Sequence, residues 1–306
     1  MPAQRVALLG LGLIGASFGL ALKATSPSLT LVGFDPNGET ARRVKNSGAI
    51  DQRVDSAAEA VQNADLVILA APVRAILELL DEIGPHLVPG VLVTDTGSTK
   101  ALIVERAEAA LPAGAAFVGG HPMTGRLSAG VSGPDPALYR NAVYCLTPTS
   151  STPPEALERA TGLVESIGAR LRFLDPGEHD ALLAGISHLP YFTAAALVAA
   201  VTSQSAWADM SGLAAGGFRT VTSLVEASDE MWTDVALSNR EPLLRQMDEL
   251  IETLTGIRAL VADGRGDELA TLLGKAHKVR QEWTANQPGG AQAMPAPSPR
   301  RFPFFR

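Results

Sequence analysis

The sequence predicts an α/β protein in which a doubly wound parallel sheet precedes an all-helical domain. Strand-like apolar runs alternate with helical segments over residues 1–175, and this alternation is typical of a parallel sheet. Residues 176–286 show only helical periodicity, with apolar residues spaced three and four positions apart. The length of 306 residues also favours two domains over one. Residues 287–306 are rich in Pro, Gly and Ala, and we expect a disordered tail there.

Seven runs of the first domain are expected to form its strands. They are apolar throughout, so both faces of the sheet should be covered by helices. The strands are expected at residues 5–10, 29–35, 64–72, 90–97, 115–122, 141–148 and 169–175. Helices between the first five of them are expected at residues 13–24, 39–48, 75–87 and 99–111.

The helical domain is expected to form a homodimer. Its first segment, "HDALLAGISHLPYFTAAALVAAV", is apolar on nearly all sides, and a helix of that kind is normally buried. A small helical domain cannot bury it alone, so we expect burial against a second subunit. The helical segments are expected at residues 177–201, 205–215, 229–238, 240–263 and 266–284.

Composition excludes several classes of protein. Hydrophobic residues make up 46% of the chain, and the net charge of −7 argues against a nucleic-acid or anionic membrane surface. The single cysteine, Cys145, cannot form an intramolecular disulfide or a zinc cage, so we expect no structural metal. Glycines interrupt the apolar N-terminus, and no run approaches the roughly 18–20 apolar residues that a transmembrane helix needs. We expect a soluble protein of the cytoplasm.

A glycine motif predicts a dinucleotide site of the Rossmann type. The stretch "GLGLIG" matches G-x-G-x-x-G and stands between a predicted strand and a predicted helix. Gly10 permits a tight turn, Gly12 lets the backbone approach a pyrophosphate, and Gly15 permits close packing of helix on strand. The helix N-terminus offers N–H groups to the phosphates. The predicted loop comprises Gly10, Leu11, Gly12, Leu13, Ile14 and Gly15.

The residue at the end of the second predicted strand favours NAD over NADP. Asp35 ends the second predicted strand, twenty residues after Gly15, where a carboxylate can bind both ribose hydroxyls and would repel a 2′-phosphate. Two further strand ends should border the same site, since ligands bind at the carboxyl ends of strands in such sheets. They carry Ala71 and Pro72, and Thr96 and Gly97.

Two side chains are candidates for catalysis. Ser98 follows one predicted strand, and His121 stands in "GGHPMTG", which is expected to be a glycine turn after the next strand. Both residues should reach the crevice that holds the glycine loop. A hydroxyl and an imidazole there could deprotonate an alcohol while hydride leaves its carbon. The alternatives are a helix cap for Ser98 and a structural turn for His121.

The chain resembles the prephenate/arogenate dehydrogenases of tyrosine biosynthesis. The matching stretches span most of residues 5–285, and the combination of "GGHPM-G", "SHLP" and "GGFR" is specific. Hydroxyacid dehydrogenases and pyrroline-carboxylate reductases share only the glycine loop and the two-domain plan. In order, the matching stretches are "GLGLIG", "FDPN", "DTGSTK", "GGHPMTG", "SHLPYF", "GGFRTVTS" and "EMWTDVALSNREPLL".

The resemblance implies NAD-dependent oxidative decarboxylation of prephenate to 4-hydroxyphenylpyruvate. His121 would accept the proton of the ring C4 hydroxyl while C4 passes hydride to NAD, after which CO2 is lost and the ring aromatises. Ser98 would hydrogen-bond His121 and the substrate hydroxyl. His188 is implied to contact the substrate, and Arg219 to bind a carboxylate through its two-pronged guanidinium.

Two positions depart from the family pattern. Tyr191 stands where many members have a second histidine, and Ser223 stands where many have an arginine thought to clamp a substrate carboxylate. Both positions belong to the implied substrate site. The departures keep arogenate, whose side chain bears an ammonium group, open as the substrate.

Two other functions stay open at this point. A reductase of the β-hydroxyacid or imine type would need a catalytic lysine in the first helix of the second domain, and residues 177–201 contain none. A sensor that binds NAD without turnover is favoured by Tyr191 and Ser223. The retained Ser98 and His121 argue against it.

Overall fold

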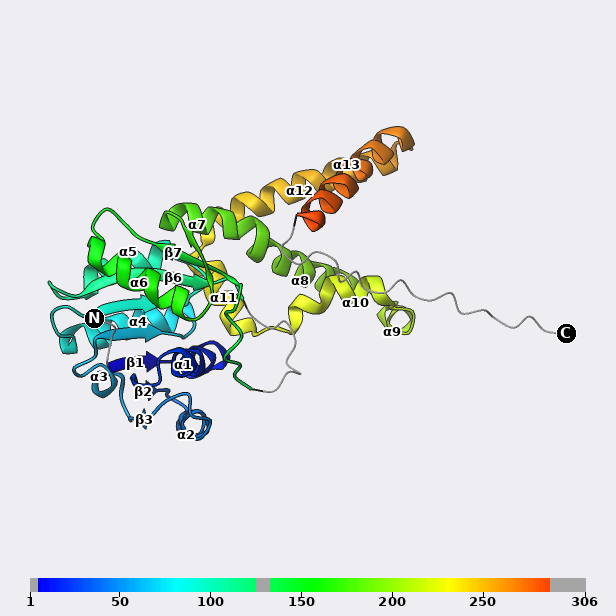
Figure 1. The fold of residues 1–306 in the computed structure, drawn as a ribbon. Coiled ribbons are helices and arrows are strands. Elements are labelled where there is room, and N and C mark those ends of the chain that lie inside the picture. Colours follow the sequence, from blue (N-terminus) through cyan, green and yellow to red (C-terminus); the bar gives the residue numbers. More distant parts are fainter. Residues whose placement is uncertain (1–4, 125–132, 287–306) are drawn as a thin grey trace. The chain divides into compact units, whose positions relative to one another are not determined.

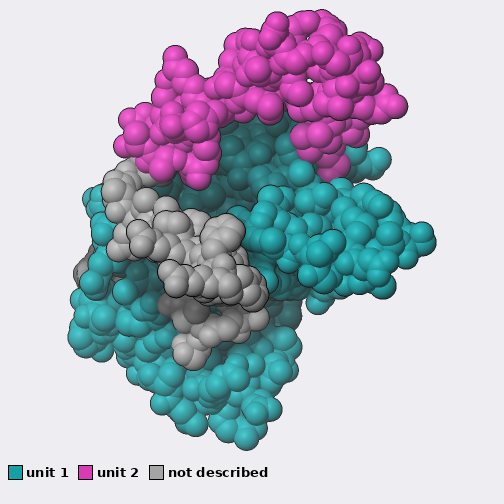
Figure 2. All heavy atoms as spheres, turned by 90° about the vertical axis from the view of Figure 1, so that its right-hand side faces the viewer, with its two compact units in different colours: residues 1–246 teal, residues 247–306 magenta. Residues whose placement is uncertain are grey.

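The computed structural model describes residues 5–124 and 133–286. The predicted disordered tail at 287–306 and the final glycine of "GGHPMTG", Gly125, lie outside the described residues. The chain divides into two compact units, residues 1–246 and residues 247–306 (Figure 2). The first unit holds the sheet and the helices that border it, and the second holds a helical pair.

One eight-stranded sheet organises the first unit, and Figure 1 shows it surrounded by helices. Its strand order is β3-β2-β1-β4-β5-β6-β7-β8. The order reverses direction between β1 and β4, and in open α/β sheets ligands bind at such a point, beyond the carboxyl ends of the strands. The strands are β1 (Arg5–Leu9), β2 (Thr30–Phe34), β3 (Gln52–Arg53), β4 (Leu66–Leu69), β5 (Leu92–Asp95), β6 (Ala116–Pro122), β7 (Val143–Thr147) and β8 (Arg170–Phe173).

Helices cover both faces of the sheet, as predicted. Side chains of β1 alternate between two apolar clusters, with Val6 and Leu8 in one and Ala7 and Leu9 in the other. The first cluster contains buried residues of α1 (Leu13–Thr25), α2 (Gly38–Asn46) and α6 (Pro154–Ser166). The second contains those of α3 (Ala57–Ala60), α4 (Val73–Ile83) and α5 (Ala101–Ala110).

The sheet is predominantly parallel, as predicted, but one pair of neighbouring strands is antiparallel. The β7 strand runs antiparallel to β6, and β8 runs parallel to β7. A parallel connection normally needs a helical crossover, and residues 133–142, the described part that leads into β7, contain turns and no helix. Three elements had no predicted counterpart, namely β3, α3 and α6, of which the first two are only two and four residues long.

The segment that contains His121 lies within the strand predicted at residues 115–122, and the glycines beside it do not form the turn that was expected to follow that strand. It forms the end of β6, where His121 lies opposite Cys145 of β7. Gly119 and Gly120 serve close packing instead of a turn, since a Cβ on Gly119 would lie 2.3 Å from Thr147 Oγ1. A Cβ on Gly120 would lie 2.5 Å from the Asp95 carbonyl oxygen.

Helices follow the sheet, and within the described residues no strand comes after β8. A continuous helical stretch at Pro176–Thr202 contains a π-helical turn, η2, at Ala184–His188. Pro190 follows this turn, and because proline lacks an N–H and crowds the preceding turn, it accounts for the irregularity. The other elements are α7 (Pro176–Leu183), α8 (Leu189–Thr202), α9 (Trp207–Ser211), α10 (Gly216–Thr222), η3 (Ser223–Glu226), α11 (Asp229–Ser238), α12 (Arg240–Ala262) and α13 (Gly266–Ala285).

The stretch Pro176–Thr202 is long and apolar enough to cross a membrane by length and composition, and an 18-residue window within it has a mean hydropathy of 1.5. The expectation that no such stretch exists is therefore wrong. The stretch also carries three buried polar residues, His179, Asp180 and His188, each hydrogen-bonded to another part of the chain. Buried polar groups with protein partners are typical of a core helix, which passes the same test.

The second unit contains the end of α12 and all of α13, joined by a turn in which Gly264 has a φ of +66°. Six large apolar side chains among its described residues are exposed in the single chain. They are Ile251, Leu254, Val261, Leu273, Val279 and Trp283.

Candidate active site

The loop between β1 and α1 has the geometry of a phosphate-binding turn. Gly10 has a φ of +89°, and a Cβ on it would lie 2.3 Å from the Ala70 carbonyl oxygen. A Cβ on Gly15 would lie 2.0 Å from the Gly10 carbonyl oxygen, so neither position has room for a side chain. A Cβ on Gly12, in contrast, would meet nothing within 4 Å. Since α1 begins at this loop without a side-chain cap, its first N–H groups can bind a phosphate there.

Asp35 is tied to the same loop. Its Oδ2 accepts a hydrogen bond of 2.8 Å from the Leu11 N–H, and its Oδ1 accepts one of 2.9 Å from the Asn37 N–H. Asn37 in turn caps α2 by accepting hydrogen bonds from Glu39 and Thr40. The structure thus brings Asp35 together with the glycine loop. Leu13 and Ile14, the two apolar residues between Gly12 and Gly15, are half-buried.

The neighbouring strand ends lie at the same edge of the sheet. Ala71 and Pro72 follow β4, and Thr96 and Gly97 follow β5, which pairs with β4. The Thr96 N–H donates to the Leu69 carbonyl oxygen at 3.0 Å. This hydrogen bond holds Thr96 and Gly97 beside the end of β4, which Ala71 and Pro72 follow. The predicted cofactor-binding residues are therefore assembled at one edge of the sheet.

A fully buried ion pair lies beneath this edge. Lys100 Nζ donates to Asp95 Oδ2 and, at 2.8 Å, to the Gly120 carbonyl oxygen. Asp95 also accepts hydrogen bonds from the N–H groups of Gly97 and Gly120, at 2.7 and 3.0 Å. Burial lowers the pKa of Lys100, and Asp95 offsets part of this effect. The pair fixes the backbone next to Ser98 and next to His121.

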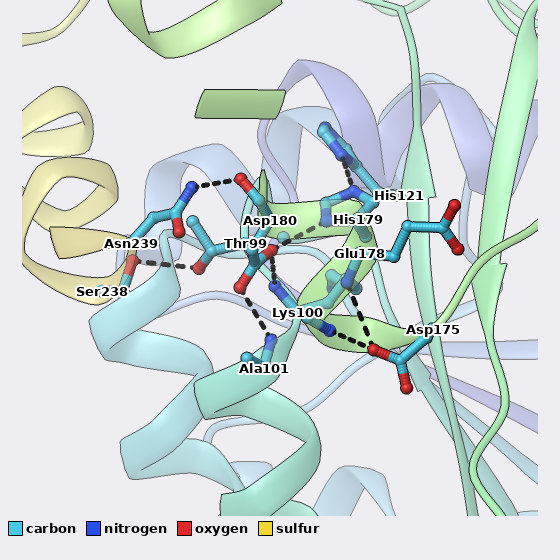
Figure 3. A network of polar contacts seen from close by, with 12 residues as sticks. Thr99, Lys100, Ala101, His121, Asp175, Glu178, His179, Asp180, Ser238 and Asn239 are labelled. Atoms are coloured by element: carbon cyan, nitrogen blue, oxygen red, sulfur yellow. Dashed lines mark hydrogen bonds and ion pairs between the residues drawn. The ribbon is translucent and has the colours of Figure 1, made fainter. Parts of the chain in front are cut away.

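His121 belongs to a hydrogen-bonded array that reaches into α7 (Figure 3). Its Nδ1 lies 2.9 Å from His179 Nε2, and His179 Nδ1 lies 2.8 Å from Asp180 Oδ1. His121 is 9% exposed, whereas His179 is fully buried. Burial, together with His179, Lys100 and His188, lowers the pKa of His121 well below 6.5. The imidazole is therefore neutral at physiological pH.

One nitrogen of His121 stays available for chemistry. Its Nε2 has no hydrogen-bond partner among residues 5–124 and 133–286, and it is not sealed from solvent. Ser98 does not hydrogen-bond His121, contrary to expectation, and the partner of His121 Nδ1 is His179 instead. The Ser98 hydroxyl likewise has no partner within the described part of the chain.

His188 lies on the π-helical turn and is completely buried. Its Nδ1 pairs with Asn239 Nδ2 at 3.1 Å, and Asn239 also donates to the Asp180 carbonyl oxygen at 2.8 Å. Its Nε2 is buried without a partner among the described residues. Because a buried polar atom without a partner is costly, this nitrogen is a candidate for ligand contact.

Aromatic side chains surround His188. Tyr191 stacks on Trp232 with ring centroids 4.1 Å apart and an interplanar angle of 10°. The His188 ring meets Trp232 edge-on at 6.1 Å, and Trp232 Nε1 is buried without a partner in the described chain. The structure thus places His188 and Tyr191 on one aromatic wall.

The remaining predicted substrate residues are not part of this arrangement. Arg219 is exposed on α10, and none of its side-chain atoms hydrogen-bonds a described residue. Ser223 is half-buried on η3, where its hydroxyl donates to the Thr220 carbonyl oxygen at 3.0 Å.

Burial of His188 predicts an acid-sensitive fold. Burial lowers the pKa of His188 from 6.5 to about 4, so below pH 6.5 the unfolded chain binds a proton that the folded chain does not. The free energy of unfolding should therefore fall as the pH drops from 6.5 toward 4, by about 3 kcal/mol from this residue. Urea unfolding of the wild type and His188→Gln across this range measures the effect. Identical pH slopes for the two proteins would contradict it.

Sequence reasoning missed most of the array. His179, Asp180 and Asn239 were not identified, nor were the buried Lys100 and Asp95. One signal was present, because His179, Asp180 and His188 are polar residues in a helix that is otherwise apolar on nearly all sides. A polar residue on such a helix needs a buried partner.

Comparison with known proteins agrees with this architecture. The model of the prephenate dehydrogenase nucleotide-binding domain matches residues 18–173, and that of the prephenate dehydrogenase dimerization domain matches residues 175–275. A nucleotide-binding sheet followed by a helical dimerization domain defines a two-domain dehydrogenase. The division into residues 1–175 and 176–286 stays a prediction.

The chain belongs to the prephenate dehydrogenase family. It is 36% identical to prephenate dehydrogenase of Bacillus subtilis over 94% of this chain and 78% of that protein. A crystal structure of the A. aeolicus prephenate dehydrogenase with hydroxyphenyl propionate and NAD+ is 28% identical, covers 92% of this chain and 99% of that one, and has a TM-score of 0.85. The Synechocystis arogenate dehydrogenase is 30% identical, covers 91% and 99% of the two chains, and has a TM-score of 0.77.

Proposed function

We propose that this enzyme catalyses the NAD-dependent oxidative decarboxylation of prephenate to 4-hydroxyphenylpyruvate. The observation that carries the proposal is the free Nε2 of a neutral His121, held at the edge of a nucleotide-binding sheet. Family membership supports the substrate class. The A. aeolicus relative was crystallised with NAD+ and a hydroxyphenyl compound, which supports the same cofactor and an aromatic product.

The glycine loop and its neighbours fit a dinucleotide. Gly12 leaves open space beside the uncapped start of α1, where the N–H groups would hold the pyrophosphate. Asp35 would bind the ribose hydroxyls, and its carboxylate would repel a 2′-phosphate, so NAD is preferred over NADP. Bound NAD supplies the hydride acceptor. The other lining residues are Ala71, Pro72, Thr96 and Gly97.

His121 acts as the base and Ser98 orients the substrate. A neutral imidazole with a free Nε2 can accept the proton of the substrate hydroxyl at that atom. The Ser98 hydroxyl, free of protein partners, would hydrogen-bond the same substrate oxygen. Removing the proton of the substrate hydroxyl favours loss of hydride from the carbon that bears this hydroxyl group.

Four residues are proposed to bind the rest of the substrate. His188 Nδ1 accepts from the Asn239 amide, so His188 would donate from its unpartnered Nε2, and Tyr191 would contribute its phenol beside it. The substrate-binding roles of Arg219 and Ser223 rest on the family resemblance alone. The exposed guanidinium of Arg219 is free to pair with a carboxylate.

Arogenate is the second candidate substrate. Tyr191 and Ser223 replace a histidine and an arginine of the family pattern, which removes potential positive charge from the substrate site. A site with less positive charge suits a side chain that carries an ammonium group. The structural likeness to the Synechocystis arogenate dehydrogenase supports this candidate.

We further propose a homodimer formed through the helical domain, in the cytoplasm. The match to a dimerization domain supports this assembly. Within the first unit, Ile186 of η2 is 72% exposed and Leu237 of α11 is 71% exposed. Large exposed apolar side chains in a dimerization domain are expected to be covered by the partner.

The test is NADH formation with prephenate and arogenate offered in parallel, each with NAD and with NADP. Turnover of prephenate with NAD is expected. Turnover of arogenate alone would replace prephenate by the second candidate. Binding of NAD without oxidation of either compound would refute the proposed substrate class.

Two glycine variants separate folding from cofactor binding. Gly12→Ala should fold normally but lose NAD affinity, since its Cβ enters only the open space proposed for the pyrophosphate. Gly15→Ala should lower the free energy of unfolding by about 1–3 kcal/mol, because its Cβ would overlap the Gly10 carbonyl oxygen. Calorimetric titration with NAD and thermal unfolding of both variants measure the two effects. Unchanged NAD affinity in Gly12→Ala would contradict the proposed site.

A further inference from the structure

We propose that His179 and Asp180 are positioning residues that hold His121 in a single tautomer, with its proton on Nδ1 and a bare Nε2 facing the substrate. The inference rests on the proposed function of His121 and deepens it. It gives a role to two buried residues that lie outside the glycine loop and that the proposed chemistry does not otherwise use (Figure 3).

Counting protons along the array fixes the tautomer. Asp180 Oδ1 accepts a hydrogen bond of 2.7 Å from the Lys100 N–H, and Oδ2 accepts one of 2.9 Å from the Ala101 N–H. A carboxylate that also faces His179 Nδ1 at 2.8 Å can only accept, so His179 carries its proton on Nδ1. In neutral His179 the Nε2 is then an acceptor. His121 must therefore donate to it from Nδ1, which leaves its own Nε2 without a proton.

The end of the array is rigidly held. Both N–H donors to Asp180 belong to the first residues of α5, and the positive end of a helix stabilises a carboxylate placed there. Asn239 of the α11–α12 junction donates to the Asp180 backbone carbonyl at 2.8 Å. His179 is fully buried and Asp180 is 2% exposed, so water does not compete for either residue. An acceptor fixed in this way determines the orientation of both rings.

The array also stabilises His121 after it has taken up the proton. When His121 Nε2 takes the hydroxyl proton, the ring carries two N–H groups and a positive charge. The Nδ1 proton still points to His179, so the charge is balanced through His179 by the Asp180 carboxylate. The other titratable groups that face His121 are Lys100, His188 and Cys145, and none of them is an anion at neutral pH. Asp180 therefore supplies the negative end of the array.

Asp180→Asn tests this role. An asparagine whose amide nitrogen takes the Oδ1 position faces His179 Nδ1 with that nitrogen and keeps its carbonyl oxygen on the Ala101 N–H, although it loses the hydrogen bond from the Lys100 N–H. It would donate to His179 Nδ1, reverse both tautomers and place a proton on His121 Nε2. We expect kcat to fall about 10²–10⁴-fold with little change in KM, as for a base held in the wrong tautomer.

The matched control is Asp175→Asn. Asp175 is an exposed carboxylate that caps α7 through the N–H groups of Gly177 and Glu178, and it does not join the array. Asparagine caps helices equally well, so this variant changes the same charge on the same helix and should keep wild-type kcat. An Asp180→Asn variant as active as Asp175→Asn would overturn the proposal.

The tautomer of His121 can be measured directly in the absence of substrate. Long-range proton–nitrogen correlation spectra of isotope-labelled wild type should show His121 protonated on Nδ1, with its signals assigned by their absence in His121→Gln. A His121 proton on Nε2 overturns the proposal even if Asp180→Asn does not fold. If the Nδ1 tautomer is found but neither prephenate nor arogenate is oxidised, the proposed substrate fails while the positioning of His121 stands.

Discussion

Replacing His121 with glutamine is expected to lower kcat for NADH formation about 10³-fold, within the range that a general base contributes. Glutamine is similar in length and its amide group can donate the hydrogen bond that His179 Nε2 accepts, but it cannot take a proton at neutral pH. The glycine loop and Asp35 follow other strands, β1 and β2, so NAD affinity should stay within about twofold of wild type, as for distant independent sites.

His86→Gln is the matched control for this prediction. His86 is exposed in the short 3₁₀ turn Gly84–His86, away from the carboxyl edge of the sheet. It should retain wild-type kcat. A His121→Gln variant with kcat within tenfold of His86→Gln would show that another group takes the hydroxyl proton.

Replacing Lys100 with methionine is expected to destabilise the protein by about 3–5 kcal/mol. Methionine fills a similar volume, but it leaves the Asp95 carboxylate buried with only two backbone N–H donors and leaves the Gly120 carbonyl oxygen without the Lys100 donor. Both residues of the pair are 0% exposed, so neither water nor salt can replace the lost partner. Urea unfolding measures the change.

Two comparisons make this stability prediction specific. Lys278→Met removes an exposed partner of Glu282 and should leave the free energy of unfolding unchanged. The double variant Lys100→Met, Asp95→Asn removes both charges and should be more stable than Lys100→Met alone. Equal destabilisation of the single and double variants would show that the buried charge of Asp95 is not the cause.

Much of the sheet was predictable from local sequence. Apolar runs and helical periodicity identified most strands and helices, because both patterns follow from which side chains must be buried. The glycine loop was predictable for the same local reason, since Gly10 and Gly15 have no room for a Cβ. The direction of β7 was not, because it depends on the connection between two strands and not on the residues of either one.

The glycines beside His121 show where local reasoning was ambiguous. The run at residues 115–122 predicted a strand, and glycine and proline also indicated a turn after it, but Gly119 and Gly120 are small because β6 packs closely against Thr147 and Asp95. Close packing and tight turns both select glycine, and one sequence cannot distinguish them.

The partners of His121 could not be predicted from spacing. His179 lies 58 positions later in the chain, and Asp180 reaches Lys100 across 80 positions. Contacts of this kind depend on how the helical segment packs on the sheet. The available signal was chemical, because three buried polar residues on an apolar helix require polar partners elsewhere in the fold.

The pH dependence of kcat/KM for NADH formation tests most directly the claim that a neutral His121 is the base. Burial, His179, Lys100 and His188 all lower the pKa of His121, so the active neutral form should persist as the pH falls below 6.5. The account predicts that kcat/KM of the wild type stays constant through pH 6.5 and falls only at lower pH. The residual kcat/KM of His121→Gln should not show this fall. An acid limb that is unchanged in His121→Gln would contradict the account, because the group that loses activity on protonation would then be another residue.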